Sequence, residues 1–444
     1  MKKIAPIIIL TILSALFIFY RFNDIPKNLS FDEVEFAKLA LSLQNRPYTP
    51  YSTLATGHST LYFYILLASL KTFGINTFAL RFPAAIFGIL SVLLFYLIMK
   101  RVFQKQIVHL TPNTYHLTFI PFFFALILLS SRWFLNFSRF SFEATFLLFL
   151  ELMSIYFLLL ADAKMTNFFA TLDLATAKRL QRSQKKLTSS ISSNFYLIIS
   201  GLFAGLAFLS YTPGRIFFLL PMGFLLFRKQ FNNKTMRQLL LFIIPFIITV
   251  TPLTLYFSTH IDTRIDQQFF LMNHEMPIQE KLTGLWHNVS TTALMFNIKG
   301  DINGRHNYPG KPALNPILGL LFTIGLVITM KQWNNNNNKL FLIYFFLSLL
   351  PALSTYPWEN PNMLRTFTVI PAIVYFAGQS LLSGISLFDK SKNKTSVLLI
   401  LMAFVTVSFF YELRTYFKYQ SQVFKESFEI YNPLEKELKV NKKL

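Results

Sequence analysis

Apolar runs alternate with short polar segments along almost the whole chain. Many of these runs approach the roughly 20 residues that an α-helix needs to cross the hydrocarbon core of a bilayer. They cover residues 4–20, 77–99, 117–131, 144–161, 194–210, 213–228, 238–257, 313–330, 340–355, 366–388 and 396–411. The pattern predicts an all-α polytopic membrane protein with about 11 transmembrane helices.

The polar segments between the runs differ in charge, and this difference predicts an orientation. Lys and Arg gather in alternate connections, such as residues 100–105 and 162–193, as they do in cytoplasmic loops. Lys2 and Lys3 precede the first run, so we expect a cytoplasmic N-terminus. In this topology residues 1–411 form one transmembrane domain, whose outer segments include a first loop at 21–76 and a long loop at 258–312, and residues 412–444 form a polar outer tail.

Composition supports this class and excludes others. The chain is 53% hydrophobic and only 14% charged. Its net charge of +22 would suggest nucleic-acid binding in a soluble protein, but here it reflects the basic loops. No basic stripe interleaves with stacking aromatic residues, so we expect no nucleic-acid partner. The absence of Cys excludes disulfides, thiol catalysis and Cys-ligated metal centres.

The segment Leu-Ser-Phe-Asp-Glu-Val-Glu, which begins nine residues after the first apolar run, carries three acids within four positions. Ser30 followed three residues later by Glu33 is a capping box, which predicts that a helix begins here. Phe31, Val34 and Leu41 recur at helical spacing. We therefore expect an amphipathic helix that lies on the membrane surface with these three residues on its apolar face.

Asp32 would lie in the first turn of this helix, where backbone N–H groups and the helix dipole favour a carboxylate anion. A carboxylate at the mouth of a cavity can take the proton of an attacking hydroxyl. We predict that Asp32 is a catalytic base and Glu33 its acidic neighbour; the alternative is that both acids only cap the helix. The apolar run 61–73 is short and contains Lys71, which predicts a second interfacial helix, with a full span as the alternative.

Several arginines occur at the outer boundaries of the predicted spans. Arg139 and Glu143 are four residues apart, so they form either a helical ion pair or a site in which Arg139 binds an anionic headgroup and Glu143 flanks the cavity. Arg215, Arg305 and Arg365 each lie beside turn residues. Arg suits bidentate phosphate contacts, although any single one can be a snorkelling anchor. We expect at least one phosphate ligand among them.

Histidines supply the remaining candidates. His58, His274 and His306 could ligate a metal together with Asp32 or Glu143, but no pair has metal-ligand spacing. We therefore take His58 and His306 as substrate-binding candidates and leave a divalent metal open. The sequence has no Walker loop, dinucleotide fingerprint or nucleophile elbow, so direct use of a soluble nucleotide donor is not indicated.

The chain resembles the GT-C membrane glycosyltransferases, and most closely the bacterial branch grouped with protein O-mannosyltransferases and aminoarabinose transferases, glycosyltransferase family 39. The likeness covers about the first 160 residues and rests on architecture beyond them. It is carried by the pair Asp32-Glu33, the stretch Gly57-His58-Ser59-Thr60-Leu61-Tyr62, the run Ala79-Leu80-Arg81-Phe82-Pro83-Ala84-Ala85, and Ser138-Arg139.

The resemblance implies an inverting transfer of a sugar from a polyprenyl-phosphate donor to a protein, lipid or glycan acceptor on the outer face of the cytoplasmic membrane, with Asp32 as the base. Many relatives have Glu-Lys-Pro-Pro-Leu where this chain has Gly57-His58-Ser59-Thr60-Leu61. The missing Glu puts in doubt a metal site there. With the Lys missing, His58 is the candidate substitute for it near the donor phosphate. A lipid-linked sugar flippase or transporter and a membrane glycan polymerase are the alternative functions.

Overall fold

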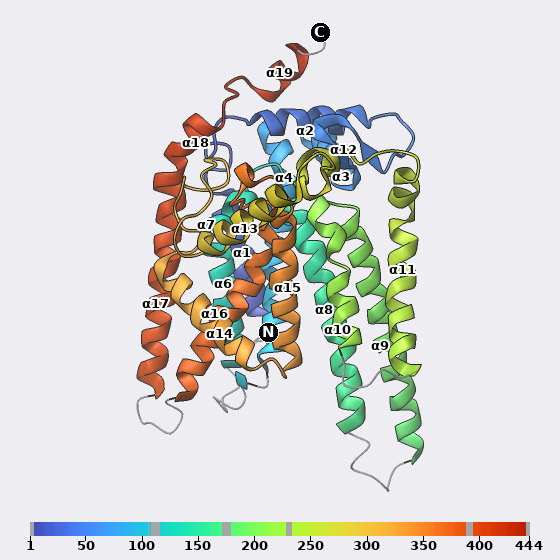
Figure 1. The fold of residues 1–444 in the computed structure, drawn as a ribbon. Helices are drawn as coiled ribbons and strands as arrows, with labels where there is room; N and C mark the ends of the chain where they lie inside the picture. The colour runs from blue at the N-terminus through green and yellow to red at the C-terminus, as the bar shows by residue number, and fades with distance from the viewer. Residues whose placement is uncertain are drawn as a thin grey trace.

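The computed structural model describes residues 4–104, 106–107, 116–170, 179–227, 233–387 and 394–440. Helices dominate this part of the chain (Figure 1). The longer helices of the bundle are α1 (Ala5–Phe19), α4 (Thr77–Val102), α6 (His116–Ser130), α8 (Ala144–Ala170), α9 (Arg179–Phe208), α11 (Asn233–Phe257), α14 (Pro316–Lys331), α15 (Asn336–Leu353), α16 (Ile370–Leu387) and α17 (Lys394–Arg414).

Shorter elements connect these helices. The helices and helical turns among them are α2 (Phe31–Ser42), η1 (Leu54–Thr56), α3 (Leu61–Phe73), α7 (Arg132–Phe137), η2 (Thr212–Ile216), α10 (Leu219–Leu226), α12 (Thr263–Gln268), η3 (Phe270–Met272), α13 (Ile278–Met295), η4 (Pro357–Glu359), η5 (Phe367–Val369), η6 (Thr415–Gln420), α18 (Ser421–Ser427) and α19 (Leu434–Val440). The strands β1 (Tyr51–Ser52) and β2 (His58–Ser59) pair antiparallel.

Four helical segments of the described residues are long and apolar enough to cross a membrane: Thr77–Val102, Ala144–Asp162, Thr235–Phe257 and Phe367–Leu387. Six further apolar helices in the same residues are shorter. The chain is therefore a multi-pass membrane protein, and the count of about 11 spans stays a prediction.

One expected span differs from the structure. The run 213–228 does not begin as a continuous helix, because η2 and α10 divide it and α10 is only 8 residues long. Pro213 starts the tight turn, and Gly214 lies so close to the carbonyl of Ala207 that a larger residue would collide with it. The sequence pattern correctly indicated an apolar segment but did not predict that its helix is interrupted.

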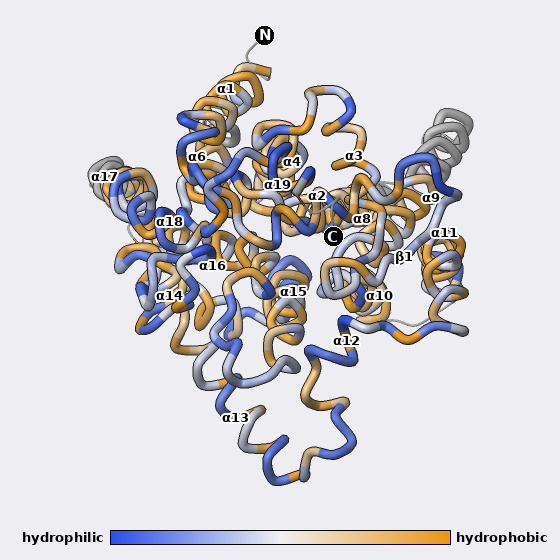
Figure 2. The backbone as a smooth tube through the Cα atoms, turned by 90° about the horizontal axis from the view of Figure 1, so that it is seen from above, coloured by the Kyte–Doolittle hydropathy of each residue, from blue (hydrophilic) through white to orange (hydrophobic). Residues whose placement is uncertain are grey.

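The segments predicted to lie outside gather at one end of the bundle. Figure 1 shows α2 and α3 of the first outer loop, α12 of the long outer loop, and α18 and α19 of the tail at this end. From above, α2 lies near the centre of the molecule (Figure 2). Their shared position agrees with the predicted topology. The assignment of this end to the outer face stays a prediction, and Lys2 and Lys3 lie outside the described residues.

α2 and α3 are short helices, as predicted, but α2 is more deeply packed than a surface helix. Ala37, Leu39 and Ala40 of α2 are completely buried. The expected apolar face is wrong at Phe31, whose side chain is 58% exposed, whereas the charged Glu33 is buried. The face of α2 that packs against the protein is therefore set partly by the ion pair between Glu33 and Arg81, and not by hydrophobicity alone.

Candidate active site

The first turn of α2 is fixed by the predicted capping box, which the structure confirms. Ser30 Oγ accepts a hydrogen bond from the backbone N–H of Glu33 at 3.2 Å, and Glu33 Oε2 accepts one from the N–H of Ser30 at 3.1 Å. The helix begins at Phe31, so Asp32 lies in its first turn. An anion at this position is stabilised by the positive end of the helix dipole.

Asp32 and Arg305 join the two long loops that are predicted to lie outside. Arg305 Nη1 donates to Asp32 Oδ2 at 2.7 Å, although 273 residues separate the two along the chain. The side chain of Asp32 is 43% exposed and that of Arg305 is 25% exposed. Ion pairs that water reaches contribute little net stability, so this pair can open to admit a ligand at small cost. The structure thus brings together two residues that the sequence singled out separately.

Glu33 lies in a different environment from its neighbour Asp32. Both of its carboxylate oxygens accept hydrogen bonds from Arg81, from Nε at 2.7 Å and from Nη2 at 2.8 Å, and both side chains are fully buried. Glu33 Oε1 also accepts from the N–H of Ser141 at 3.1 Å. With the bond from Ser30 it has two partners on each oxygen. Its geometry is that of a group that holds α2 in place.

His58, Glu143 and Arg264 form a buried polar cluster. Glu143 Oε1 lies 2.6 Å from His58 Nδ1, and Arg264 Nη1 lies 2.5 Å from His58 Nε2. His58 comes from β2, Glu143 from the start of α8 and Arg264 from α12, so three distant segments meet here. Phe36 and Phe63 pack against the imidazole edge to face. Two predicted site residues, His58 and Glu143, are therefore in direct contact.

The protonation of His58 follows from its surroundings. Burial lowers the pKa of His58 below its ordinary value of 6.5, and the nearby Arg264 guanidinium lowers the pKa further. A neutral imidazole can donate from Nδ1 to Glu143 and keep Nε2 as an acceptor, and Arg264 Nη1 lies within 3.1 Å of both ring nitrogens. Glu143 Oε2 is buried and has no hydrogen-bond partner among the described residues. One carboxylate oxygen is thus available to a proton donor.

Arg139 is fully buried, and backbone carbonyl groups occupy its guanidinium. Its five N–H donors are shared among the carbonyl oxygens of Phe17, Ile18, Arg21 and Ile25. This geometry corrects two expectations. Arg139 has no donor left for an anionic headgroup, and it forms no ion pair with Glu143. It holds the end of α1 and the loop that follows.

The other predicted phosphate ligands are paired with acids. Arg215 forms an ion pair with Asp262, and Arg365 forms one with Glu359. Their side chains are 12% and 11% exposed, less than half the value for Arg305. His306 Nδ1 lies 2.9 Å from Asp301 Oδ2, in a buried pair near the base of the loop that carries Arg305. Among these candidates the structure places Arg305 beside Asp32.

The described residues do not fit a divalent metal well. In 4–104, 106–107 and the later described ranges, no three His, Asp or Glu side chains converge as a metal site requires. The pair His58 and Glu143 comes nearest, but Arg264 already occupies the second imidazole nitrogen. The metal left open by the sequence stays untested, and we derive no reaction step through it.

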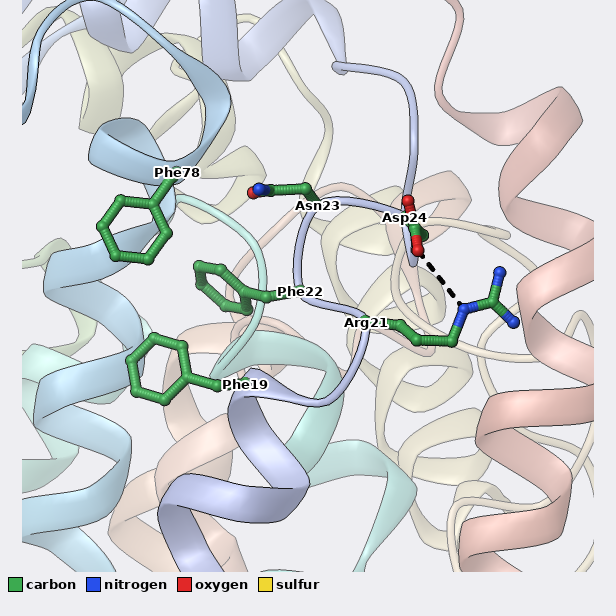
Figure 3. A pocket seen from close by; sticks show the side chains of 6 residues that line it. All are labelled: Phe19, Arg21, Phe22, Asn23, Asp24 and Phe78. Carbon is green, nitrogen blue, oxygen red and sulfur yellow. Dashed lines mark hydrogen bonds and ion pairs between the residues drawn. The ribbon is translucent and has the colours of Figure 1, made fainter.

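An open pocket of about 670 Å³ lies where α1 ends. Figure 3 shows the rings of Phe19, Phe22 and Phe78 on one side of the loop and the ion pair of Arg21 and Asp24 on the other. A second pocket of about 400 Å³ lies beside the start of α14. Asp32 lines neither of them. The expected cavity at Asp32 is therefore not one of these two pockets.

Two residues that shape the candidate site, Arg81 and Arg264, were missed as site residues. Arg81 lies inside an apolar run, and a charge in such a run needs a buried partner, so the sequence did contain a signal. Arg264 lies in a polar loop among other charged residues and carries no comparable signal. Its role depends on the folding of α12 onto β2.

Comparison with known proteins gives a likeness in structure but none in sequence. No protein-family model matches the chain, and no curated protein matches it. The fold is similar to that of ArnT from Cupriavidus metallidurans bound to undecaprenyl phosphate, with a TM-score of 0.51, 12% identity, and coverage of 95% of this chain and 76% of ArnT.

A second group of similar structures comes from Archaeoglobus fulgidus. The archaeal oligosaccharyltransferase AglB in complex with an inhibitory peptide and a dolichol-phosphate has a TM-score of 0.50 and 14% identity, over 96% of this chain. The apo form of the Archaeoglobus enzyme has a TM-score of 0.52 and 13% identity, over 97% of this chain. The chain spans 56% of the length of these enzymes. The overall likeness to AglB and ArnT shows that the chain has the GT-C fold of membrane glycosyltransferases.

Proposed function

We propose that the protein is an inverting glycosyltransferase that moves a sugar from a polyprenyl-phosphate donor to a hydroxyl or similar nucleophile of an acceptor. The observation that carries the proposal is the contact between Asp32 and Arg305, a base and a cation at the partly exposed start of α2, in a chain with the GT-C fold. The structures of ArnT and AglB hold undecaprenyl phosphate and a dolichol-phosphate, which supports a lipid-phosphate donor.

In the proposed reaction Asp32 accepts the proton of the acceptor hydroxyl while the acceptor oxygen forms a bond to the anomeric carbon. The bond between that carbon and the donor phosphate oxygen breaks, and its electron pair leaves with the polyprenyl phosphate. Attack from the face opposite the leaving group inverts the anomeric configuration. Arg305 stabilises the negative charge that develops on the phosphate, because Arg forms charge-assisted hydrogen bonds to phosphate oxygens.

Arg305 suits this part because it holds Asp32 through a single N–H. The described residues offer its other guanidinium donors no further partner, so they remain available to phosphate oxygens. We assign Glu33 a positioning role, because its carboxylate is fully engaged by Arg81 and backbone groups. His58 and Glu143 are proposed to bind the substrate through the free oxygen of Glu143.

We place the protein in the cytoplasmic membrane with the Asp32 end outside. This placement rests on the basic connections predicted to lie inside and on the gathering of α2, α12 and α18 at one end. A polyprenyl-phosphate donor anchored in the bilayer would then present its sugar at that end. The acceptor and the class of sugar are set by contacts beyond those that Asp32 and Arg305 supply.

The test is replacement of Asp32 by Asn, which keeps the shape of the side chain and removes its basicity. Glycans and glycolipids are compared by mass spectrometry in cells that lack the gene and are complemented with the wild type or the variant. A lost positioned base typically costs about 10²–10⁴-fold in rate, so the product should disappear while the protein stays in the membrane. Asp266→Asn, an exposed Asp of α12, is the matched control and should keep full activity.

Full product in the Asp32→Asn strain would end the proposal. Movement of a labelled lipid-linked sugar across vesicles without covalent transfer would replace it with the flippase or transporter. Products that grow by repeated units would replace single-sugar transfer with the membrane glycan polymerase.

A further inference from the structure

Four consecutive residues of the C-terminal tail, Ser427–Ile430, contact the surroundings of both Asp32 and Arg305. We propose that this stretch, called the clasp below, positions the proposed base and the proposed cation relative to each other, with Glu429 as its main positioning residue. The clasp depends on the function proposed for Asp32 and Arg305. The clasp is thus an additional part of the site, in a segment that the sequence analysis described only as a polar tail.

On the Asp32 side, the clasp is bonded to the residues that start α2. The N–H of Leu29 donates to the carbonyl of Ile430 at 3.0 Å, and the N–H of Ile430 donates back to the carbonyl of Leu29 at 2.9 Å. Glu429 Oε1 accepts a hydrogen bond from the N–H of Phe31 at 2.9 Å. The first N–H groups of a helix have no partner within it, so a carboxylate there fixes the turn that carries Asp32.

On the Arg305 side, the clasp packs against the neighbouring glycine. A Cβ added to Gly304 would collide with Ser427 Oγ and would come within 2.8 Å of Val423 Cγ1. The loop that carries Arg305 can therefore approach α18 this closely only because residue 304 has no side chain. The position of Arg305 and the position of the clasp are coupled through this contact.

Between these two contacts, the clasp is anchored in the protein core. Phe428 is completely buried, and the Arg81 guanidinium lies over its ring at 5.8 Å from the centroid. Phe428 also packs edge to face on Phe140 and Phe424. Arg81 is also the buried ion-pair partner of Glu33, so the same guanidinium contacts both the clasp and α2. A tail fixed in this way acts as a structural part of the site.

The inference is tested by two substitutions and a compensating variant of each. Glu429→Ala removes the cap on Phe31, whereas Glu429→Gln keeps an oxygen that can accept the same hydrogen bond. Gly304→Ala introduces the collision, and Gly304→Ala combined with Ser427→Gly and Val423→Ala removes the atoms that it would meet. Glu426→Ala, an exposed acid of α18, is the matched control.

Two readouts are measured on the full-length protein. The first is the cellular product used for Asp32→Asn, normalised to protein in the membrane. The second is amide hydrogen exchange of residues 29–36 in purified protein, which needs no substrate. Because loss of a helix cap shifts equilibria by about fivefold, Glu429→Ala should lower the product and speed exchange by about that factor. Glu429→Gln should restore both, and the triple variant should restore the product lost in Gly304→Ala.

Wild-type product and wild-type exchange in Glu429→Ala would overturn the clasp, and so would faster exchange with unchanged product. Equal losses in Glu429→Ala and Glu429→Gln would also overturn it, because the acceptor oxygen would then not matter. None of these outcomes changes the result expected for Asp32→Asn. An inactive Asp32→Asn together with a fully active Glu429→Ala refutes the clasp alone, whereas an active Asp32→Asn refutes the proposed function itself.

Discussion

The adjacent residues Asp32 and Glu33 both carry a carboxylate, but they differ in their exposure and in their hydrogen-bond partners. Asp32 is partly exposed and holds one N–H of Arg305, whereas Glu33 is buried and fully bonded. The residue that can change partners is the one that can perform proton transfer. The residue that cannot change partners fixes the helix on which the first one lies.

This difference predicts that the two substitutions lower the stability by different amounts. Glu33→Ala leaves Arg81 buried without its partner, and breaking a buried pair in this way costs about 3–5 kcal/mol of stability. Asp32→Ala breaks a partly exposed pair and should cost less than about 1 kcal/mol. Unfolding temperatures followed by Trp fluorescence in detergent measure both. Glu280→Ala, an exposed acid of α13, is the control, and equal temperatures for the variants at 33 and 280 would contradict the assignment.

His58 predicts a dependence of stability on pH. Its pKa is lowered in the folded protein, first by burial and then by Arg264, so the unfolded chain takes up the proton at a higher pH than the folded protein does. The stabilising contribution is therefore complete above about pH 6.5 and is lost as the pH falls below that value.

The unfolding temperature of the wild type should decrease between pH 7 and pH 5, and His58→Gln should make this decrease smaller. His274→Gln removes an exposed imidazole and should leave the slope unchanged. An identical slope in the wild type and in His58→Gln would show that this imidazole is not held neutral by the fold.

At the scale of elements, two buried arginines build the segment that leads from α1 to α2. Arg139 binds the carbonyls of Phe17, Ile18, Arg21 and Ile25. Arg81 binds the carbonyls of Pro26 and Asn28 at 2.6 and 2.7 Å, in addition to Glu33. These bonds attach the end of α1 and the segment 21–28 to the two buried guanidinium groups. The start of α2 is therefore held from both sides.

Arg139→Lys tests this structural role against the phosphate role expected from the sequence. An ammonium group has three donors and cannot reach all the carbonyls that a planar guanidinium reaches. With hydrogen bonds to charged groups worth about 1.5–3 kcal/mol each, we expect a loss of stability on the order of 3 kcal/mol. Binding of undecaprenyl phosphate per folded molecule should not change. A weaker phosphate affinity with wild-type stability would return Arg139 to the donor site.

The contrast between Arg139 and Arg305 explains how far sequence reasoning could reach. The start of α2 and the capping box follow from residues 30–33 alone, so local rules predicted them. Both arginines lie in segments that precede a predicted span, and no local pattern tells which of them meets a carboxylate. One meets four backbone carbonyls and the other meets Asp32, because of contacts between segments more than 100 residues apart. Such contacts are set by tertiary packing, which single-sequence patterns do not record.

The same limit applies to the tail. Residues 412–444 have the polar composition of a free segment, yet Phe428 and Leu434 are buried and the chain returns to Leu29. The tail contains many apolar residues, and Tyr416, Phe424 and Phe428 recur near helical spacing, but a single-sequence pattern does not say what such a face packs against. The helical bundle itself was predictable, because long apolar runs are a strong and local signal.

At the scale of the molecule, the proposal requires that the end carrying α2, α12 and α18 face away from the cytoplasm. The net charge of +22 is spread so that basic connections fall between the spans at the other end of the predicted topology. A donor anchored in the bilayer and a base on the wrong side of it could not meet. Orientation is therefore a condition of the mechanism.

The chain contains no Cys, so single cysteines report orientation without background. Leu54 in η1 and Tyr431 in the tail are 46% and 75% exposed, and Trp333 between α14 and α15 is 46% exposed. In intact cells a membrane-impermeant maleimide should label Leu54→Cys and Tyr431→Cys, and should label Trp333→Cys only after the membrane is opened. Figure 1 shows the turn between α14 and α15 at the opposite end of the bundle from α2. Labelling of Trp333→Cys alone in intact cells would place Asp32 in the cytoplasm and would exclude transfer on the outer face.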